Sequence, residues 1–143
     1  MNTRKNVDRA KAYLGQIRRY DIMIKNKLEM LARLREQAIS ISAPMGGERV
    51  KTSLKPDKLS EAVAKIVDLE SIIKGDVDEL TKIKDEVVST IDRLDDADMI
   101  NLLYKRYVHY ERWERIADEL GFAVPTVYRL HGKALIKLEK LLD

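Results

Sequence analysis

The chain of 143 residues contains no cysteine, which excludes disulfide bonds, thiolate metal sites and a cysteine nucleophile. It has only three prolines and six glycines, which leaves room for long uninterrupted helices. No apolar run approaches the length of a membrane span. Residues 1–14 also lack the apolar core of a signal peptide. We therefore expect a protein of the cytosol, without a membrane partner.

Catalytic patterns are absent as well. There is no Ser/His/Asp order with a glycine turn, no metal-ligand pair at helical spacing and no dinucleotide fingerprint. Gly46 and Gly47 lack the Gly-Lys-Ser/Thr of a phosphate loop, so they predict a simple turn. Four aspartates between residues 92 and 98 lack the spacing of a calcium loop and indicate helix capping. We expect no enzyme activity, no metal and no cofactor.

Two long stretches instead carry helical periodicity. In residues 4–40, apolar positions recur every seven residues. In residues 58–95 the same spacing continues over six heptads, at Leu59, Ile66, Ile73, Leu80, Val87 and Leu94. A second row, four residues beyond members of the first, consists of Val63, Val77 and Ile91. Pro44 and Pro56 stop the helices at the intervening loop, residues 42–56. The pattern predicts that residues 1–95 form a long antiparallel coiled-coil hairpin.

The two arms of this predicted hairpin carry opposite charge. Residues 1–41 hold ten Lys/Arg against four Asp/Glu, and residues 57–95 hold six against eleven. Mutual pairing of the arms explains this distribution, and a second nucleic-acid surface on the basic arm is the alternative. The long apolar stripes also predict a homodimer, in which two hairpins form a four-helix bundle.

Residues 96–143 predict a separate helix-turn-helix domain, with helices at about residues 99–108, 112–120 and 124–142. Gly121 stands where a sharp turn needs positive φ, and Phe122 would plug that turn. Apolar side chains mark the buried face of both helices, at Ile116, Ala117, Leu120, Val127 and Leu130. We expect Trp113 and His131 to pack in the core. No segment has the pattern of a strand, so the predicted fold class is all-α.

The last helix is basic on its polar face, which is typical of a helix that enters the major groove of DNA. Arg129 is the candidate for a guanine, and Lys133 and Lys137 suit phosphates. Thr126 and Tyr128 could contact a thymine methyl or a phosphate, and Pro125 fits the first helical turn. Arg112 and Arg115 open the preceding helix, where a phosphate is favoured. The alternative is a helical packing unit whose basic face is merely solvated.

Residues 94–140 resemble the fourth conserved region of bacterial primary sigma factors. The similar motifs are Leu-Tyr-Lys-Arg-Tyr at 103–107, Trp-Glu-Arg-Ile-Ala-Asp-Glu-Leu-Gly at 113–121 and Lys-Ala-Leu-Ile-Lys-Leu at 133–138. The whole chain, with Ser-Ala-Pro-Met-Gly-Gly-Glu-Arg-Val at 42–50 and Val-Tyr-Arg-Leu-His-Gly at 127–132, resembles sigma-factor-like late-gene regulators of phages and prophages, of the RinA and ArpU kinds. The resemblance implies a sequence-specific transcriptional regulator in the bacterial host cytosol, with host RNA polymerase as a further candidate partner.

The chain departs from the sigma pattern at Val124, Pro125 and Tyr128, which stand where sigma factors carry base-reading residues. Its target is therefore expected to differ from the sigma promoter element. Nothing in the chain resembles the sigma regions that bind core polymerase and melt DNA. Two other functions remain open: a DNA-packaging protein of the small-terminase type, and a module that binds RNA polymerase or a host regulator without binding DNA.

Overall fold

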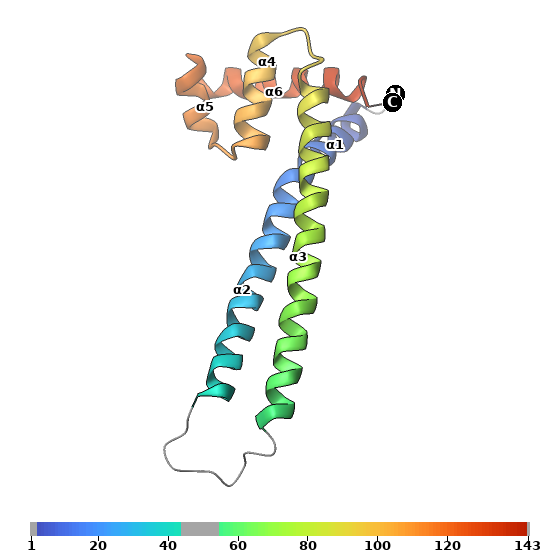
Figure 1. Cartoon of the computed structure of the whole chain (residues 1–143). Helices are drawn as coiled ribbons and strands as arrows, with labels where there is room; N and C mark the ends of the chain where they lie inside the picture. Colours follow the sequence, from blue (N-terminus) through green and yellow to red (C-terminus); the bar gives the residue numbers. More distant parts are fainter. Residues whose placement is uncertain (1–2, 44–54, 143) are drawn as a thin grey trace. The chain divides into compact units, whose positions relative to one another are not determined.

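The computed structural model describes residues 3–43 and 55–142, and over these ranges the chain is helical without any strand (Figure 1). The all-α prediction is confirmed. The elements are α1 (Thr3–Leu14), α2 (Gln16–Ser42), α3 (Lys55–Ile91), α4 (Ala97–Leu103), the π-helix η1 (Tyr104–Val108), α5 (Trp113–Leu120) and α6 (Val124–Glu139). The predicted turn at Gly46 and Gly47 lies outside the described residues.

The chain forms two compact units. The first, which we call the head, comprises residues 1–20 and 80–143, and the second, which we call the hairpin unit, comprises residues 21–79. The predicted boundary between residues 95 and 96 therefore falls inside the head. The physical reason is that Ala10, Leu14 and Ile17 of the N-terminal helices are buried in the same core as the C-terminal helices.

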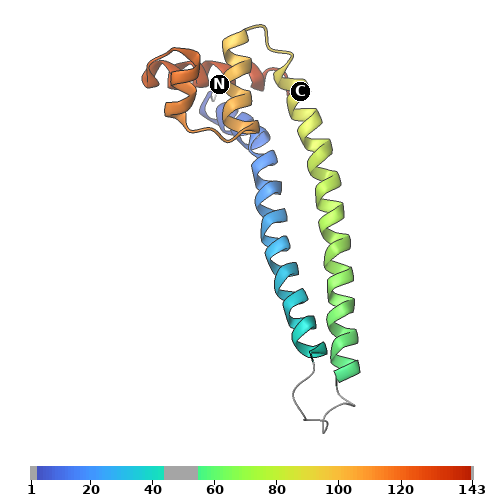
Figure 2. The same ribbon diagram turned by 60° about the vertical axis from the view of Figure 1, so that its left-hand side comes forward.

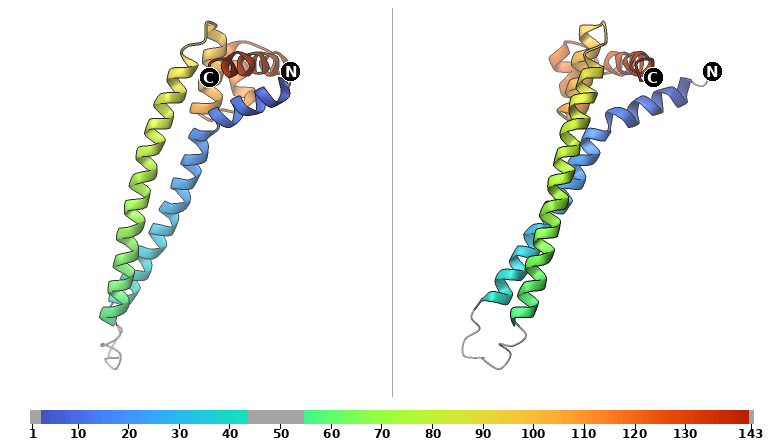
Figure 3. Two further views of the ribbon diagram at one scale, coloured as in Figure 1. Left: turned by 90° about the vertical axis from the view of Figure 1, so that its right-hand side faces the viewer. Right: turned by 45° about the vertical axis from the view of Figure 1, so that its right-hand side comes forward.

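The predicted first helix is two helices, because the chain changes direction at Gly15 (Figure 3). The Gly15 N–H still donates to the Lys11 carbonyl oxygen over 2.8 Å. A β-carbon at position 15 would lie only 3.1 Å from that same oxygen. This close approach is the reason that the bend occurs at a residue without a side chain.

In the hairpin unit, α2 and α3 run antiparallel side by side (Figure 2). Lys27 pairs with Asp76, and Arg35 pairs with Glu70 at 3.3 Å. A later residue of α2 thus pairs with an earlier residue of α3, as antiparallel helices require. A small apolar cluster joins the helices, formed by Leu31, Leu69 and Ile73 with Leu34 and Ile66. Two members of the second heptad row of α3 are less well covered, since Val63 is 47% exposed and Val77 is 43% exposed.

The head has one continuous core. Its fully buried side chains come from α1 to α6 and include Leu14, Ile91, Leu102, Leu103, Ile116, Leu135 and Leu138. Burial of each such side chain stabilises the fold by about 1.5–3 kcal/mol relative to exposure. Arg9 of α1 donates from Nη1 to Oε1 of Glu139 on α6 over 2.8 Å. Polar and apolar contacts together therefore hold α1 against α6.

The helix predicted at residues 99–108 begins at Ala97 and changes character partway. Asp96 caps α4, because its Oδ1 accepts from the Met99 N–H over 3.1 Å. From Tyr104 the chain winds as a π-helix, in which the His109 N–H donates to the Tyr104 carbonyl oxygen over 3.0 Å. A π-turn widens the helix and redirects the side chains that it carries. Here these are Lys105, Arg106 and Tyr107.

Candidate nucleic-acid interface

The turn between α5 and α6 has the geometry that the sequence predicts. Gly121 ends α5 at φ +74°, in the left-handed region that favours glycine. The N–H of Phe122 donates to the Ala117 carbonyl oxygen over 2.9 Å, and that of Gly121 reaches Asp118 over 3.3 Å. These bonds satisfy the last carbonyl groups of α5. The half-buried ring of Phe122 packs against the head core.

Helix α6 has a buried face and an exposed basic face. Its buried side includes Val127, Ala134, Leu135 and Leu138. The exposed side carries Arg129, Lys133 and Lys137, followed by Lys140 at the C-cap. The only carboxylate of this helix belongs to Glu139, which is 8% exposed and paired with Arg9. The exposed surface of α6 is therefore cationic without an acidic side chain of its own.

The start of α6 is accessible. Pro125 is exposed in the first turn, and the N-cap residue Ala123 makes no side-chain capping bond. Thr126 is half-buried, and its Oγ1 accepts a 3.3 Å bond from Nη2 of Arg129. This bond places the guanidinium of Arg129 back along the first turn of the helix. Arg129 and Thr126 thus present a donor group and a hydroxyl from one short stretch of exposed surface.

Tyr128 is 50% exposed and rests against Trp113, with the two ring centres 5.2 Å apart. Trp113 itself lies between other groups: the guanidinium carbon of Arg106 is 4.4 Å from its ring centre, and the His131 ring is 4.7 Å away, edge to face. Edge-to-face contacts between aromatic rings and contacts of a cation with a ring face are both favourable. The exposed ring of Tyr128 is therefore supported from behind by packed side chains.

His131 packs as expected, and it has a specific partner. Its Nε2 lies 2.7 Å from the hydroxyl oxygen of Tyr107 on η1, and the histidine is 8% exposed. Burial, and then the nearby charges of Lys11 and Arg106, lower the pKa of His131 to about 4. Burial also raises the pKa of Tyr107 to about 12. Both side chains are thus neutral near pH 7, and neither is exposed for a ligand.

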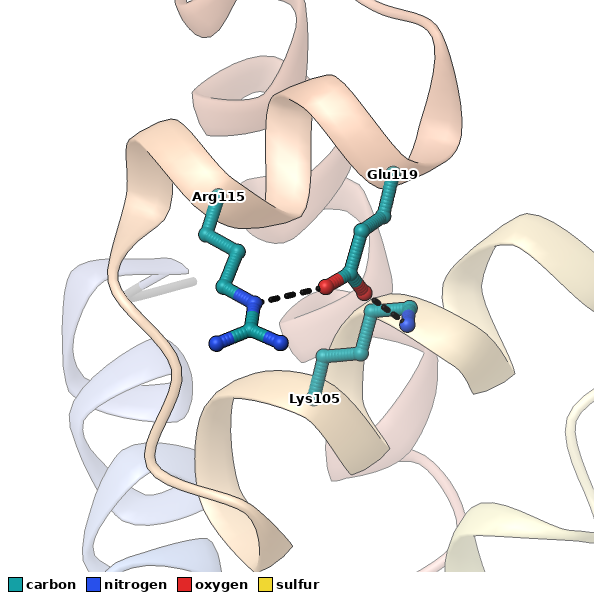
Figure 4. A network of polar contacts seen from close by, with 3 residues as sticks. All are labelled: Lys105, Arg115 and Glu119. Atoms are coloured by element: carbon teal, nitrogen blue, oxygen red, sulfur yellow. Dashed lines mark hydrogen bonds and ion pairs between the residues drawn. The ribbon is translucent and has the colours of Figure 1, made fainter.

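A three-residue ionic network joins η1 to α5 (Figure 4). Glu119 accepts from Nζ of Lys105 and, over 2.8 Å, from Nε of Arg115. The bond from Lys105, followed by that from Arg115, lowers the pKa of Glu119 to about 2. The same carboxylate raises the pKa of both cations. Of the two arginines predicted to contact phosphate, Arg115 is therefore partly neutralised, whereas Arg112 is exposed at the N-cap of α5.

The aspartates near residue 95 act separately. Asp96 caps α4, as the capping interpretation requires, but Asp92 accepts from the Tyr104 hydroxyl over 2.9 Å and Asp95 lies 3.3 Å from Nζ of Lys137. Among the described residues, no three His, Cys, Asp or Glu side chains are grouped to hold a metal ion. The contact with Asp95 also partly offsets the charge of Lys137, the side chain predicted to contact a phosphate.

Sequence reasoning missed two residues of this surface. Lys140 is exposed seven residues after Lys133, and that spacing alone could have placed it on the same face. Arg106 could not have been found in this way, because its place over Trp113 depends on the π-turn. The other predicted residues are exposed on α6 or on α5 and its N-cap, except that Thr126 is half-buried.

Comparison with known protein families, curated proteins and solved structures finds no match to this chain. Over residues 3–43 and 55–142, no helix combines the length and the apolar character needed to cross a membrane.

Proposed function

We propose that this chain binds double-stranded DNA through the exposed face of α6 and acts as a transcriptional regulator, dimerising through its helical hairpin. One observation carries the proposal: the exposed face of α6 presents four cations, Arg129, Lys133, Lys137 and Lys140, while its single carboxylate is buried against Arg9. A cationic helix without exposed acids suits the phosphate-lined walls of the major groove.

The tight turn between α5 and α6 supports this assignment. It leaves Pro125, Tyr128 and Arg129 exposed in the first turns of α6, which is where a recognition helix of the helix-turn-helix kind contacts base edges. Arg129 is the long donor in these turns and is assigned to guanine, whereas Lys133 and Lys137 are assigned to phosphates. Tyr128 offers an apolar ring edge to a thymine methyl.

The resemblance to sigma-like phage regulators makes late genes of a phage or prophage the proposed target. Host RNA polymerase is a further proposed partner, and the bacterial host cytosol is the proposed location. A single domain of this kind reads few base pairs, so two copies that read two half-sites would supply the remaining affinity. In this proposal the two copies associate through the heptad pattern of their hairpins.

The test is capture of fragments from the genome that encodes the chain, at two salt concentrations. The Arg129→Ala/Lys133→Ala double variant is compared with Lys25→Ala/Lys74→Ala, which removes two exposed cations from the hairpin unit instead. We expect enrichment of one fragment upstream of late genes, lost only in the first variant. Each phosphate contact removed should lower the slope of log affinity against log salt by about 0.9.

The other outcomes separate the alternatives. Enrichment of a packaging-start sequence would replace the regulator by a DNA-packaging protein of the small-terminase type. Absence of binding at low salt would refute DNA binding and leave a module that contacts RNA polymerase or a host regulator.

A further inference from the structure

The hairpin unit carries an apolar groove on its surface. The groove has a volume of about 420 Å³ and lies between α2 and α3; its walls include Met30, Arg33, Leu34, Asp68, Leu69 and Ile72. Met30 is 55% exposed and Ile72 is 51% exposed, although Leu69 beneath them is buried. Exposed apolar side chains that gather over a buried one mark a surface that favours a further packing partner.

Charge is arranged on this groove in a self-complementary way. The α2 wall carries the cation Arg33, and the α3 wall carries the carboxylate of Asp68 together with the cation Lys65, three residues before it. Because α2 and α3 are antiparallel, these residues lie near the same level of the hairpin, as do Arg35 and Glu70, which pair at 3.3 Å. A two-fold rotation about an axis through the groove exchanges the two walls. It would place Arg33 of each copy against Asp68 of the other.

The net charge of the whole helices favours the same pairing. Helix α2 holds six Lys/Arg against three Asp/Glu, whereas α3 holds six against nine. If α2 faced α2 of another copy, or α3 faced α3, like charges would meet, which is unfavourable in an interface. Contact between α2 of one copy and α3 of the other avoids this repulsion on both sides.

We infer that the groove is the centre of a two-fold self-association surface, and that its occupant is the same groove of a second copy of this chain. Met30, Leu34, Leu69 and Ile72 form the apolar centre, and Arg33 and Asp68 form reciprocal ion pairs across it. The inference deepens the dimer of the proposed function. Self-association is measured without DNA, however, so either proposal can fail alone.

The experiment is light scattering of the full chain at micromolar concentration, with charge-reversed variants. The wild type, whose chain mass is 16.5 kDa, is expected at twice that mass. Arg33→Asp brings two carboxylates to each contact, and Asp68→Arg brings two cations, so each variant alone should associate at least about tenfold more weakly. An equimolar mixture of the two variants restores both pairs and should return to the dimer mass.

Recovery of the dimer mass in the mixture is the decisive readout, because it requires contact between the two variant chains and cannot arise within either chain alone. A second comparison tests the apolar centre: Met30→Gln should weaken the dimer, whereas Ile39→Gln, at a residue that is 67% exposed but outside the groove, should not. Circular dichroism verifies that each variant stays helical. A monomeric wild type, variants that all remain dimers, or a mixture that stays monomeric would each overturn the inference.

Discussion

The hydroxyl oxygen of Tyr107 lies 2.7 Å from Nε2 of His131, and this contact joins the π-helix η1 to α6. The two rings stack with an angle of 22° between their planes. Because His131 is buried, the folded state favours its neutral form, and its pKa falls from 6.5 to about 4. The stability of the head should therefore depend on pH.

The sign follows from which state binds the proton first. Between pH 6.5 and about 4 the unfolded chain protonates this histidine and the folded chain does not, so the free energy of unfolding decreases as pH falls through this window. The contribution of His131 to this pH dependence of the free energy of unfolding is complete above pH 6.5 and amounts to about 3 kcal/mol at most. Urea unfolding at pH 7, 6 and 5 measures it.

The matched control is His131→Phe, which keeps a packed ring but cannot take up the proton. Its unfolding free energy should change less between pH 7 and 5 than that of the wild type. Equal slopes for the two chains would show that His131 does not titrate as described. The only other histidine, His109, is exposed, so magnetic resonance of the two ring signals gives an independent value.

Replacement of Glu119 by glutamine should release two cations. In the wild type, Glu119 bonds Lys105 and Arg115, and its pKa is lowered to about 2. Its stabilising effect is present above pH 4.5 and is lost as the pH falls toward about 2. Glu119→Gln should therefore lower Tm at pH 7 and match the wild type near pH 2.

The same variant should bind DNA more tightly at low salt if α5 lies near phosphates. Glu114→Gln is the matched control, because it removes one exposed carboxylate from the same helix. A filter-binding titration compares the two variants. An equal gain in both would mean that net charge alone matters, and that the freed Lys105 and Arg115 do not face DNA.

Gly15 and Gly75 should respond differently to substitution by alanine. Gly75 lies within α3, and a β-carbon there would have no neighbour within 4 Å, so Gly75→Ala should stabilise the chain by about 1 kcal/mol. Gly15→Ala would place its β-carbon 3.1 Å from the Lys11 carbonyl oxygen, which offsets the gain in helix propensity. Urea unfolding of both variants tests this difference, and a comparable gain at Gly15 would show that the bend tolerates a side chain.

Gly121→Ala should destabilise the head by about 1–2 kcal/mol, because alanine is strained at positive φ. No atom lies within 4 Å of the added β-carbon, so the cost is one of backbone conformation and not of crowding. Gly121→Asn, which tolerates the left-handed region better, should lose less. Thermal unfolding of the two variants measures the difference, and an alanine variant as stable as the wild type would rule out this account.

Much of the fold follows from local pattern. The heptad rows predicted a helix at residues 58–95, and α3 spans Lys55–Ile91. The residues predicted at 112–120 and 124–142 form α5 and α6 within a few positions of these limits. Gly121 was predicted at the turn because the required conformation depends on that residue alone. Periodicity and turn chemistry act over neighbouring residues, so the sequence displays them directly.

The candidate site was predicted in part for the same reason. Helical spacing was enough to place Arg129, Lys133 and Lys137 on one exposed face of α6. Spacing could not show that Arg115 shares Glu119 with Lys105, or that Lys137 lies beside Asp95, because these partners come from other segments. The charge available to a ligand depends on such neighbours.

The sequence alone determined that the described part of this protein is all helical, the approximate positions of α3, α5 and α6, and which face of α6 is basic, since each depends on short-range spacing. The tertiary structure decided that α1 belongs to the head, through contacts such as Arg9 with Glu139, and that His131 meets Tyr107. It also decided the bend at Gly15 and the π-turn at Tyr104–Val108. These features arise where the helices of the head share one core, and the packing that selects them joins residues far apart in the chain.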